Sequence, residues 1–169
     1  MKQMRAITVV LATLVVVATI SGLVRATPST AMGMFVGEPA TFDPFTVNRH
    51  SGADGGSSFP WEVVVEAMRG VTIATQTITF APGAQSGWHS HPGPVFISVS
   101  VGTMTFYEAD CTATVRMAGE GFLDTGSHPH LARNESNATA INVVTYFAPP
   151  HTSKSQLRHD ELQPLNCPL

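Results

Sequence analysis

Two pairs of histidines stand out in this chain because a single residue separates the members of each pair. His89 and His91 form the first histidine pair, and His128 and His130, with Pro129 between them, form the second. On an extended strand, side chains two residues apart project to the same face, so one strand can offer two imidazoles to one ion. Imidazole suits zinc, copper, iron and nickel. Four of the seven histidines therefore stand in a pattern that suits metal binding.

The elements that must position these histidines are predicted to be β-strands. Between residues 60 and 150, β-branched and apolar runs are bounded by glycine and proline, and none keeps a helical period. Many short strands separated by such turns are typical of a closed barrel or a two-sheet jelly roll, so the sequence predicts an all-β domain. The expected strands cover residues 63–65, 71–80, 95–101, 103–108, 112–117, 121–124, 128–134 and 139–147.

The spacing around the first histidine pair resembles the first motif of the cupin superfamily. That motif reads Gly-x5-His-x-His-x3-Glu-x6-Gly, and the positions of both glycines and both histidines are matched by Gly83, His89, His91 and Gly102. Val95 stands at the position of the glutamate.

The second histidine pair lies in a segment that resembles the second cupin motif, Gly-x5-Pro-x-Gly-x2-His-x3-Asn. Gly119, His130 and Asn134 match it, whereas Thr125 replaces the proline and Ser127 replaces the second glycine. The two motifs follow one another in the family's order, and the resemblance covers residues 61–150. It implies a cupin-type jelly-roll β-barrel over residues 60–150, with extended N- and C-terminal arms and a metal inside the barrel.

The resemblance also implies a ligand set. His89, His91 and His130 would hold a divalent ion, with Fe2+, Zn2+ and Mn2+ as the candidates. Without the glutamate, this set resembles the three-histidine cupins, such as thiol dioxygenases and some diketone-cleaving dioxygenases. Three neutral ligands leave the ion its full positive charge, which favours an anionic substrate.

His128 is the ambiguous member of the second pair. It should share the inward face with His130, because the two residues are separated by one position. We expect it to line the pocket as the catalytic acid or base, since histidine titrates near neutral pH. The alternatives are that it is a fourth metal ligand or a rim residue hydrogen-bonded to the backbone.

These features support several functions. The first hypothesis is an oxidoreductase that acts on a small anionic substrate in the manner of a dioxygenase. The alternatives are a zinc or manganese isomerase or decarboxylase, and a barrel that binds or senses a metal or small ligand without turnover. Cupins often dimerise through sheet edges, so a homodimer is a further expectation. A net charge of −3, with nine scattered lysines and arginines, argues against a nucleic-acid partner.

The first 26 residues are predicted to be a signal peptide. Lys2 and Arg5 precede an apolar run over residues 6–20, and residues 24–26 offer a small-residue cleavage site. The alternative is an uncleaved anchor, because the apolar segment approaches the ~20 residues of a spanning helix. Only this alternative would give the protein a membrane partner. The chain is therefore expected to be secreted or held at the surface of a bacterial cell. Residues 27–59 are expected to form a flexible leader or arm.

The chain contains only two cysteines, Cys111 and Cys167. In an oxidising compartment, one disulfide is the simplest arrangement. Such a bond would attach the polar tail of residues 151–169 to the domain and add roughly 4 kcal/mol of stability in the chain-entropy model. The alternatives are two free thiols, or Cys111 as a metal ligand.

Overall fold

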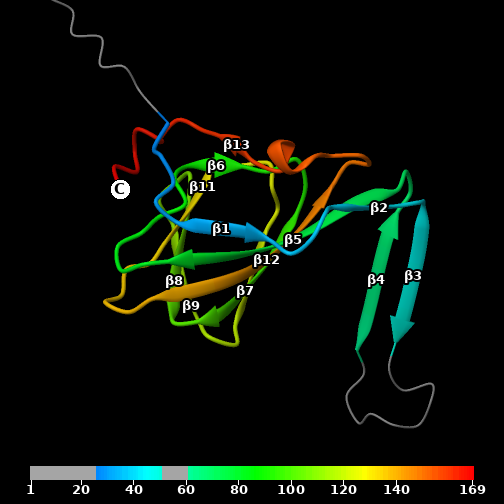
Figure 1. Cartoon of the computed structure of the whole chain (residues 1–169), viewed down its shortest axis with the longest axis horizontal. Helices are drawn as coiled ribbons and strands as arrows, with labels where there is room; N and C mark the ends of the chain where they lie inside the picture. Colours follow the sequence, from blue (N-terminus) through cyan, green and yellow to red (C-terminus); the bar gives the residue numbers. More distant parts are fainter. Residues whose placement is uncertain (1–25, 51–60) are drawn as a thin grey trace, which may run out of the picture.

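The computed structural model describes residues 26–50 and 61–169, and these form two facing β-sheets with a separate hairpin (Figure 1). The signal peptide expected over residues 1–26 lies outside the described residues except for its last position, as does the glycine- and serine-rich stretch within residues 51–60. No helix in the described part of the chain has the length and apolarity to span a bilayer.

The first sheet runs in the order β1-β5-β12-β7-β10, and β2 pairs with β5 beside β1. The second sheet runs in the order β13-β6-β11-β8-β9. Every pairing is antiparallel. The strands of the first sheet are β1 (Met32–Phe35), β2 (Ala40–Phe42), β5 (Val71–Phe80), β7 (Val95–Val101), β10 (Gly121–Asp124) and β12 (Ala140–Ala148). Those of the second are β6 (His89–Ser90), β8 (Thr103–Glu108), β9 (Ala113–Met117), β11 (His130–Arg133) and β13 (His159–Asp160).

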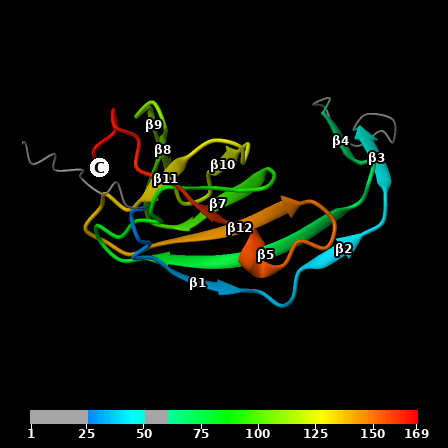
Figure 2. The ribbon, with the colours of Figure 1, turned by 90° about the horizontal axis from the view of Figure 1, so that it is seen from above.

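The two sheets form layers, with β1, β5 and β12 beneath β8, β9 and β11 in Figure 2. This arrangement confirms the predicted all-β jelly roll. No hydrogen-bonded ladder among the described strands joins the two sheets, so they form a sandwich rather than a continuous barrel.

Alternation along the strands builds the core between the layers. In β7, Val95, Ile97 and Val99 are buried while Phe96 is 52% exposed, as period-two patterning predicts. Val101 is the next residue on that face. It is 44% exposed, because the strand ends there and the chain reverses at Gly102 with a φ of +77°.

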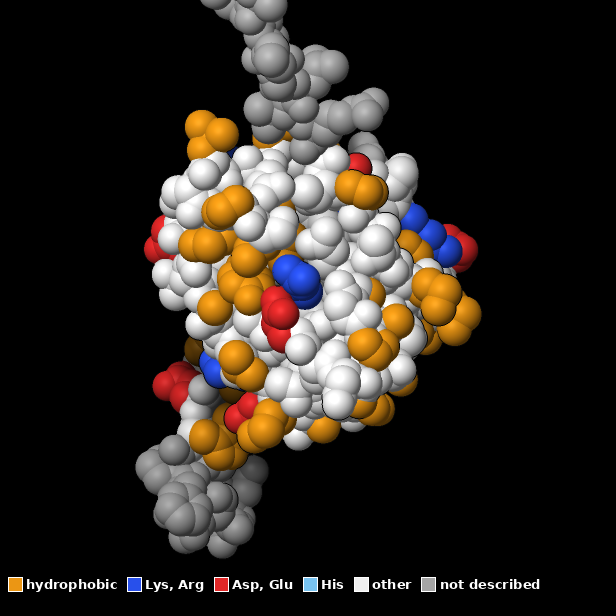
Figure 3. Space-filling view, turned by 90° about the vertical axis from the view of Figure 1, so that its left-hand side faces the viewer, with side chains coloured by type: hydrophobic (Ala, Val, Ile, Leu, Met, Phe, Trp, Pro, Cys, Tyr) orange, Lys and Arg blue, Asp and Glu red, His pale blue; other side chains and the backbone are white. Residues whose placement is uncertain are grey.

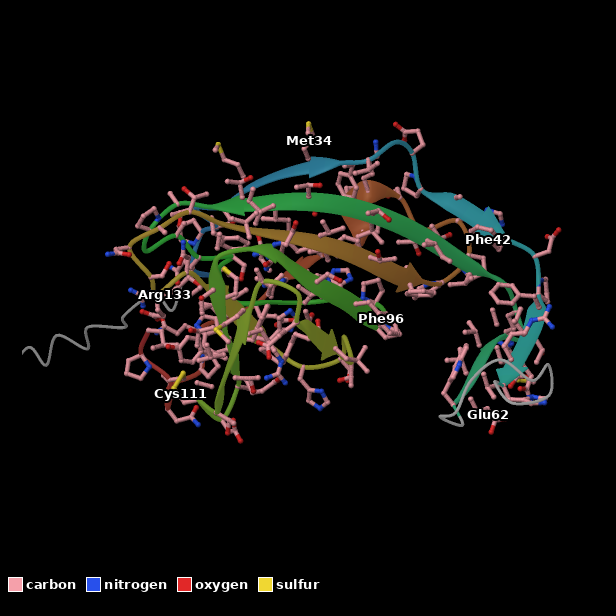
Figure 4. The ribbon with its side chains drawn as sticks, turned by 90° about the horizontal axis from the view of Figure 1, so that it is seen from below. Met34, Phe42, Glu62, Phe96, Cys111 and Arg133 are labelled. Carbon is pink, nitrogen blue, oxygen red and sulfur yellow. A yellow bond between two sulfur atoms is a disulfide. The ribbon has the colours of Figure 1, made fainter. Side chains whose placement is uncertain are left out.

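The N-terminal arm is more structured than a flexible leader. Its strands β1 and β2 lie along β5, and β3 (Phe45–His50) pairs with β4 (Glu62–Ala67) in a hairpin outside both sheets. The strand expected at residues 63–65 is therefore present as β4, but its partner is the arm. Figure 4 shows the hairpin, marked by Glu62, at the far end of the molecule from Cys111.

The C-terminal tail lies against the second sheet. After a short 3-10 helix, η1 (Lys154–Gln156), strand β13 adds to the edge of β6. Cys167 forms the predicted disulfide with Cys111, drawn in yellow in Figure 4. The disulfide lies in a small apolar cluster with the fully buried Trp88, which immediately precedes His89.

Candidate metal centre

Strand pairing brings three histidines together from two distant parts of the sequence. In the β6–β11 ladder, His130 is the direct partner of His89. His91 lies two residues beyond His89 and takes the same side of the chain. A cross-strand pair and a next-but-one neighbour are the two shortest side-chain separations on one face of a sheet.

The three imidazoles form a compact buried cluster. His89, His91 and His130 are all less than 9% exposed, and their candidate ligand atoms lie within 4.8 Å of one another. Their ring centroids are 4.3 to 5.1 Å apart. One ion can be held by ligand atoms this close. Neither cysteine is free to act as a further ligand, since both form the disulfide.

A backbone carbonyl holds the Nδ1 atom of each ring. The Nδ1 of His89 contacts the Gly87 carbonyl at 2.8 Å, and that of His130 contacts the His128 carbonyl at 3.0 Å. The Nδ1 of His91 contacts the Leu157 carbonyl, in the C-terminal tail, at 2.6 Å. A carbonyl only accepts, so each Nδ1 must carry a proton, and in the neutral ring each Nε2 then keeps a lone pair. Such outer contacts fix the tautomer and orientation of metal-binding histidines.

Burial also keeps the first pair neutral. Loss of solvent contact lowers the pKa of His91 to about 4, an effect that the Leu157 carbonyl partly opposes. Burial, reinforced by the positive charges that His130 and Arg158 can carry, lowers the pKa of His89 well below its usual value. Both rings are therefore unprotonated at neutral pH, which is the form that binds a metal.

The structure corrects the expectation for His128. This residue precedes β11 in a bend, its side chain is exposed, and its Nδ1 lies 3.0 Å from the Ser127 hydroxyl. The chain bends at His128 before β11 begins at His130, so the two side chains do not share a face. In this structure the His128 side chain thus lies outside the three-histidine cluster, and its backbone carbonyl orients His130.

Asp124 is the residue that the motif reading missed. It ends β10, is 6% exposed, and places Oδ2 3.1 Å from the Nε2 of His130 and 3.7 Å from that of His91. Alternation within residues 121–124 would have assigned Asp124 to the same face as Phe122, which packs against the core. The cluster is therefore bordered by a carboxylate, unlike the expected centre of three neutral imidazoles.

Two cavities meet at the histidines. An inner cavity of about 40 Å³ lies between the sheets, mostly among apolar side chains, with Asn142 and Tyr146 on its wall. A second, larger pocket of about 130 Å³, called the outer pocket below, shares His89, His91 and Tyr146 with it and is also lined by Arg158. The outer pocket thus places Arg158 on the same wall as two of the histidines.

The exposed surface offers little charge for a polyanionic partner. On the face shown in Figure 3, basic and acidic side chains lie next to one another, and apolar side chains are scattered among polar ones. Among the described residues, the ion pairs join Arg133 to Glu135, Lys154 to Glu38 and Arg158 to Asp160. Local neutralisation of this kind differs from the basic stripe of a nucleic-acid-binding protein.

Comparison with known proteins finds one family model that matches part of the chain. Residues 76–146 match the Cupin_2 family model, described as the Cupin domain. No curated protein sequence matches the chain.

Three solved structures are among those to which the chain is similar. A Klebsiella pneumoniae protein with a double-stranded β-helix domain is 21% identical, with 47% of this chain and 69% of that one covered and a TM-score of 0.43. The Cupin_2 domain of an XRE family transcriptional regulator from Enterobacter cloacae is 23% identical, with 47% and 83% covered and a TM-score of 0.40. A DMSP lyase from Ruegeria pomeroyi is 17% identical, with 48% and 41% covered and a TM-score of 0.43.

Proposed function

The chain belongs to the cupin superfamily, and we propose that it is an exported metalloenzyme in which His89, His91 and His130 hold one divalent ion. The reaction proposed first is a dioxygenase-like oxidation of a small anionic substrate. The observation that carries the proposal is the buried cluster in which a carbonyl fixes the Nδ1 of each ring and leaves each Nε2 free to bind. When bound, the ion supplies Lewis acidity and, as Fe2+, redox chemistry with dioxygen.

The outer pocket supports an anionic substrate. Arg158 lines this pocket together with His89 and His91, and its positive charge contributes to the lowered pKa values of both. A guanidinium recognises a carboxylate through paired hydrogen bonds. Arg158 already pairs with Asp160, which is 67% exposed and can move away into solvent.

The inner cavity supports a small apolar co-substrate. It is lined by apolar side chains from both sheets, including Ile97, Phe106 and Val144. Dry apolar cavities admit small apolar molecules, and dioxygen is of that class. Tyr146 stands between the two cavities; burial raises its pKa to about 12, so it remains a neutral hydroxyl that donates to Gln76.

Export is supported by the disulfide. Cys111 and Cys167 are joined in the structure, and such bonds persist in oxidising compartments outside the cytosol. The predicted signal peptide would direct the chain out of the cytosol. Two free thiols per chain, found by titrating the exported protein under denaturing conditions, would contradict this part of the proposal.

Metal analysis and oxygen uptake test the proposed function together. The protein is purified without oxygen, its metal content is measured, and oxygen consumption is followed with a panel of small carboxylic acids, thiols and diketones. Stoichiometric iron with substrate-dependent uptake is the expected result. Tight zinc without uptake on any panel member would contradict the oxidation. A double variant, His89→Ala with His130→Ala, should lose the metal, whereas His128→Ala should retain it.

A further inference from the structure

We propose that Asp124 is a fourth, anionic ligand of the metal centre, an inference that rests on the proposed function. The Asp124 side chain is 7% exposed, and its Oδ2 accepts no hydrogen bond among the described residues. A buried carboxylate oxygen without a donor is costly unless a cation satisfies it. The atoms nearest to this oxygen on the histidine side are the Nε2 atoms of His130 and His91.

These three atoms face one another as electron-pair donors. The Nδ1 of His130 and that of His91 are held by carbonyls, which leaves the Nε2 atoms as acceptors in the neutral rings. Acceptors only 3.1 and 3.7 Å apart repel unless a positive charge lies between them. Two ligands on one ion, each at about 2.1 Å, are separated by about 3.0 Å at a right angle and about 3.6 Å at 120°. The observed separations are close to both values.

The fold holds the carboxylate in this orientation. The Oδ1 of Asp124 accepts a hydrogen bond of 2.8 Å from the Gly126 amide, which directs Oδ2 to the histidines. Gly126 has a φ of +94° and lies so close to the Gly93 backbone that a Cβ would meet its carbonyl oxygen. Glycine is therefore required at this turn. The rigid turn fixes the carboxylate before any ion arrives.

Strand register explains how an aspartate can serve where the first motif lacks its glutamate. Asp124 is the direct cross-strand partner of Val95 in the β10–β7 ladder. Directly opposed residues project from the same face of a sheet with their Cβ atoms about 5 Å apart. The Asp124 carboxylate on β10 thus projects into the space between the sheets next to the side chain at position 95 on β7.

The fourth ligand changes the chemistry of the centre. Three neutral imidazoles leave a divalent ion with two positive charges, whereas an added carboxylate leaves one. Carboxylate ligands suit harder ions such as Mn2+ better than nitrogen ligands alone do. An anionic ligand would then bind through Arg158 as well as through the ion, rather than through the ion alone.

The test compares metal affinities of the full chain stripped of metal by a chelator. Mn2+ and Zn2+ are titrated separately into the wild type, Asp124→Asn, Asp124→Glu and the control Asp110→Asn, an exposed aspartate outside the cluster. We expect Asp124→Asn to weaken Mn2+ binding by at least about 10-fold. Mutation of a residue that only supports a ligand already costs about 10-fold in metal affinity, so loss of a ligand should cost at least as much. Zn2+ affinity should fall less than Mn2+ affinity. Asp124→Glu should recover part of the lost Mn2+ affinity, and the control should bind both ions as tightly as the wild type.

The outcomes separate this inference from the proposed function. If the wild type binds neither ion, the proposed function fails. If the wild type binds and Asp124→Asn binds Mn2+ equally well, the fourth ligand is overturned while the three-histidine site stands. An equal loss for both ions would also overturn it, because a residue that only positions His130 affects every metal alike. Circular dichroism of each metal-free variant excludes unfolding as the cause.

Discussion

The two histidine pairs have the same sequence pattern but opposite structural outcomes. His89 and His91 both reach the buried cluster, whereas the second pair contributes only His130 and leaves His128 in solvent. In the first pair, β6 starts at His89 and is flanked by strands on both sides. In the second pair, β11 starts two positions after His128, which lies in a bend. His91 lies just past the end of β6, where its backbone amide donates to the Gly126 carbonyl at 2.8 Å. A one-residue spacing therefore brings two side chains together only where the local backbone directs both to the same side.

The C-terminal tail is the second difference between the pairs. It hydrogen-bonds the strand of the first pair through β13, and the Leu157 carbonyl holds His91. The second pair orients itself, because the carbonyl of His128 holds His130. The first half of the site therefore depends on a segment that lies far away in sequence, and the second half on its own backbone.

Removing the disulfide should produce the largest loss of stability. The variant Cys111→Ser with Cys167→Ser releases a closure that spans 56 positions, worth roughly 4 kcal/mol in the chain-entropy model. Urea unfolding followed by circular dichroism measures this loss. The freed tail should also weaken metal binding, since it orients His91. Unchanged stability would show that β13 holds the tail without the disulfide.

Removing one member of the first pair should cost most of the metal affinity. Four-ligand zinc sites bind with about 10–16 kcal/mol, so one ligand accounts for roughly 3 kcal/mol, or more than a hundredfold in affinity. We expect a loss of this size for His91→Ala, measured by competition with a chelator of known affinity. If His91→Ala bound metal as tightly as the wild type, the ligand set would not include this residue.

Acid should destabilise the metal-free protein through the same histidine. The pKa of His91 falls from about 6.5 in the unfolded chain to about 4 in the folded one, so the unfolded state binds the proton first. Stability is therefore complete above pH 6.5 and falls as the pH decreases toward 4. The contribution of His91 at pH 5 is about 2 kcal/mol below that at pH 7.5. Urea unfolding at both values should show this difference in the wild type, and His91→Ala should show less of it.

Sequence reasoning reached the strands and the first histidine pair because both follow from local spacing. The expected strand over residues 71–80 is β5, and those at 95–101 and 103–108 are β7 and β8. His130 could be associated with the first pair only through the family motif, since no local pattern reveals that it pairs with His89. Asp124 was missed for a related reason: its role depends on the register of β10 against β7, which is a property of two strands together.

The smallest expected effect belongs to His128→Ala, which completes the comparison with His91→Ala. The lost side chain is exposed and its described partner is the neighbouring Ser127 hydroxyl, so stability should change by no more than about 0.5 kcal/mol, as for ordinary surface sites. The backbone carbonyl that orients His130 is still present in the variant, so the substitution removes no ligand contact. Metal affinity should therefore stay within about twofold of the wild type. Chelator competition and urea unfolding on the same preparations measure both quantities. A loss comparable with that of His91→Ala would mean that the second pair acts through both side chains, and the bend before β11 would have to become extended when metal binds.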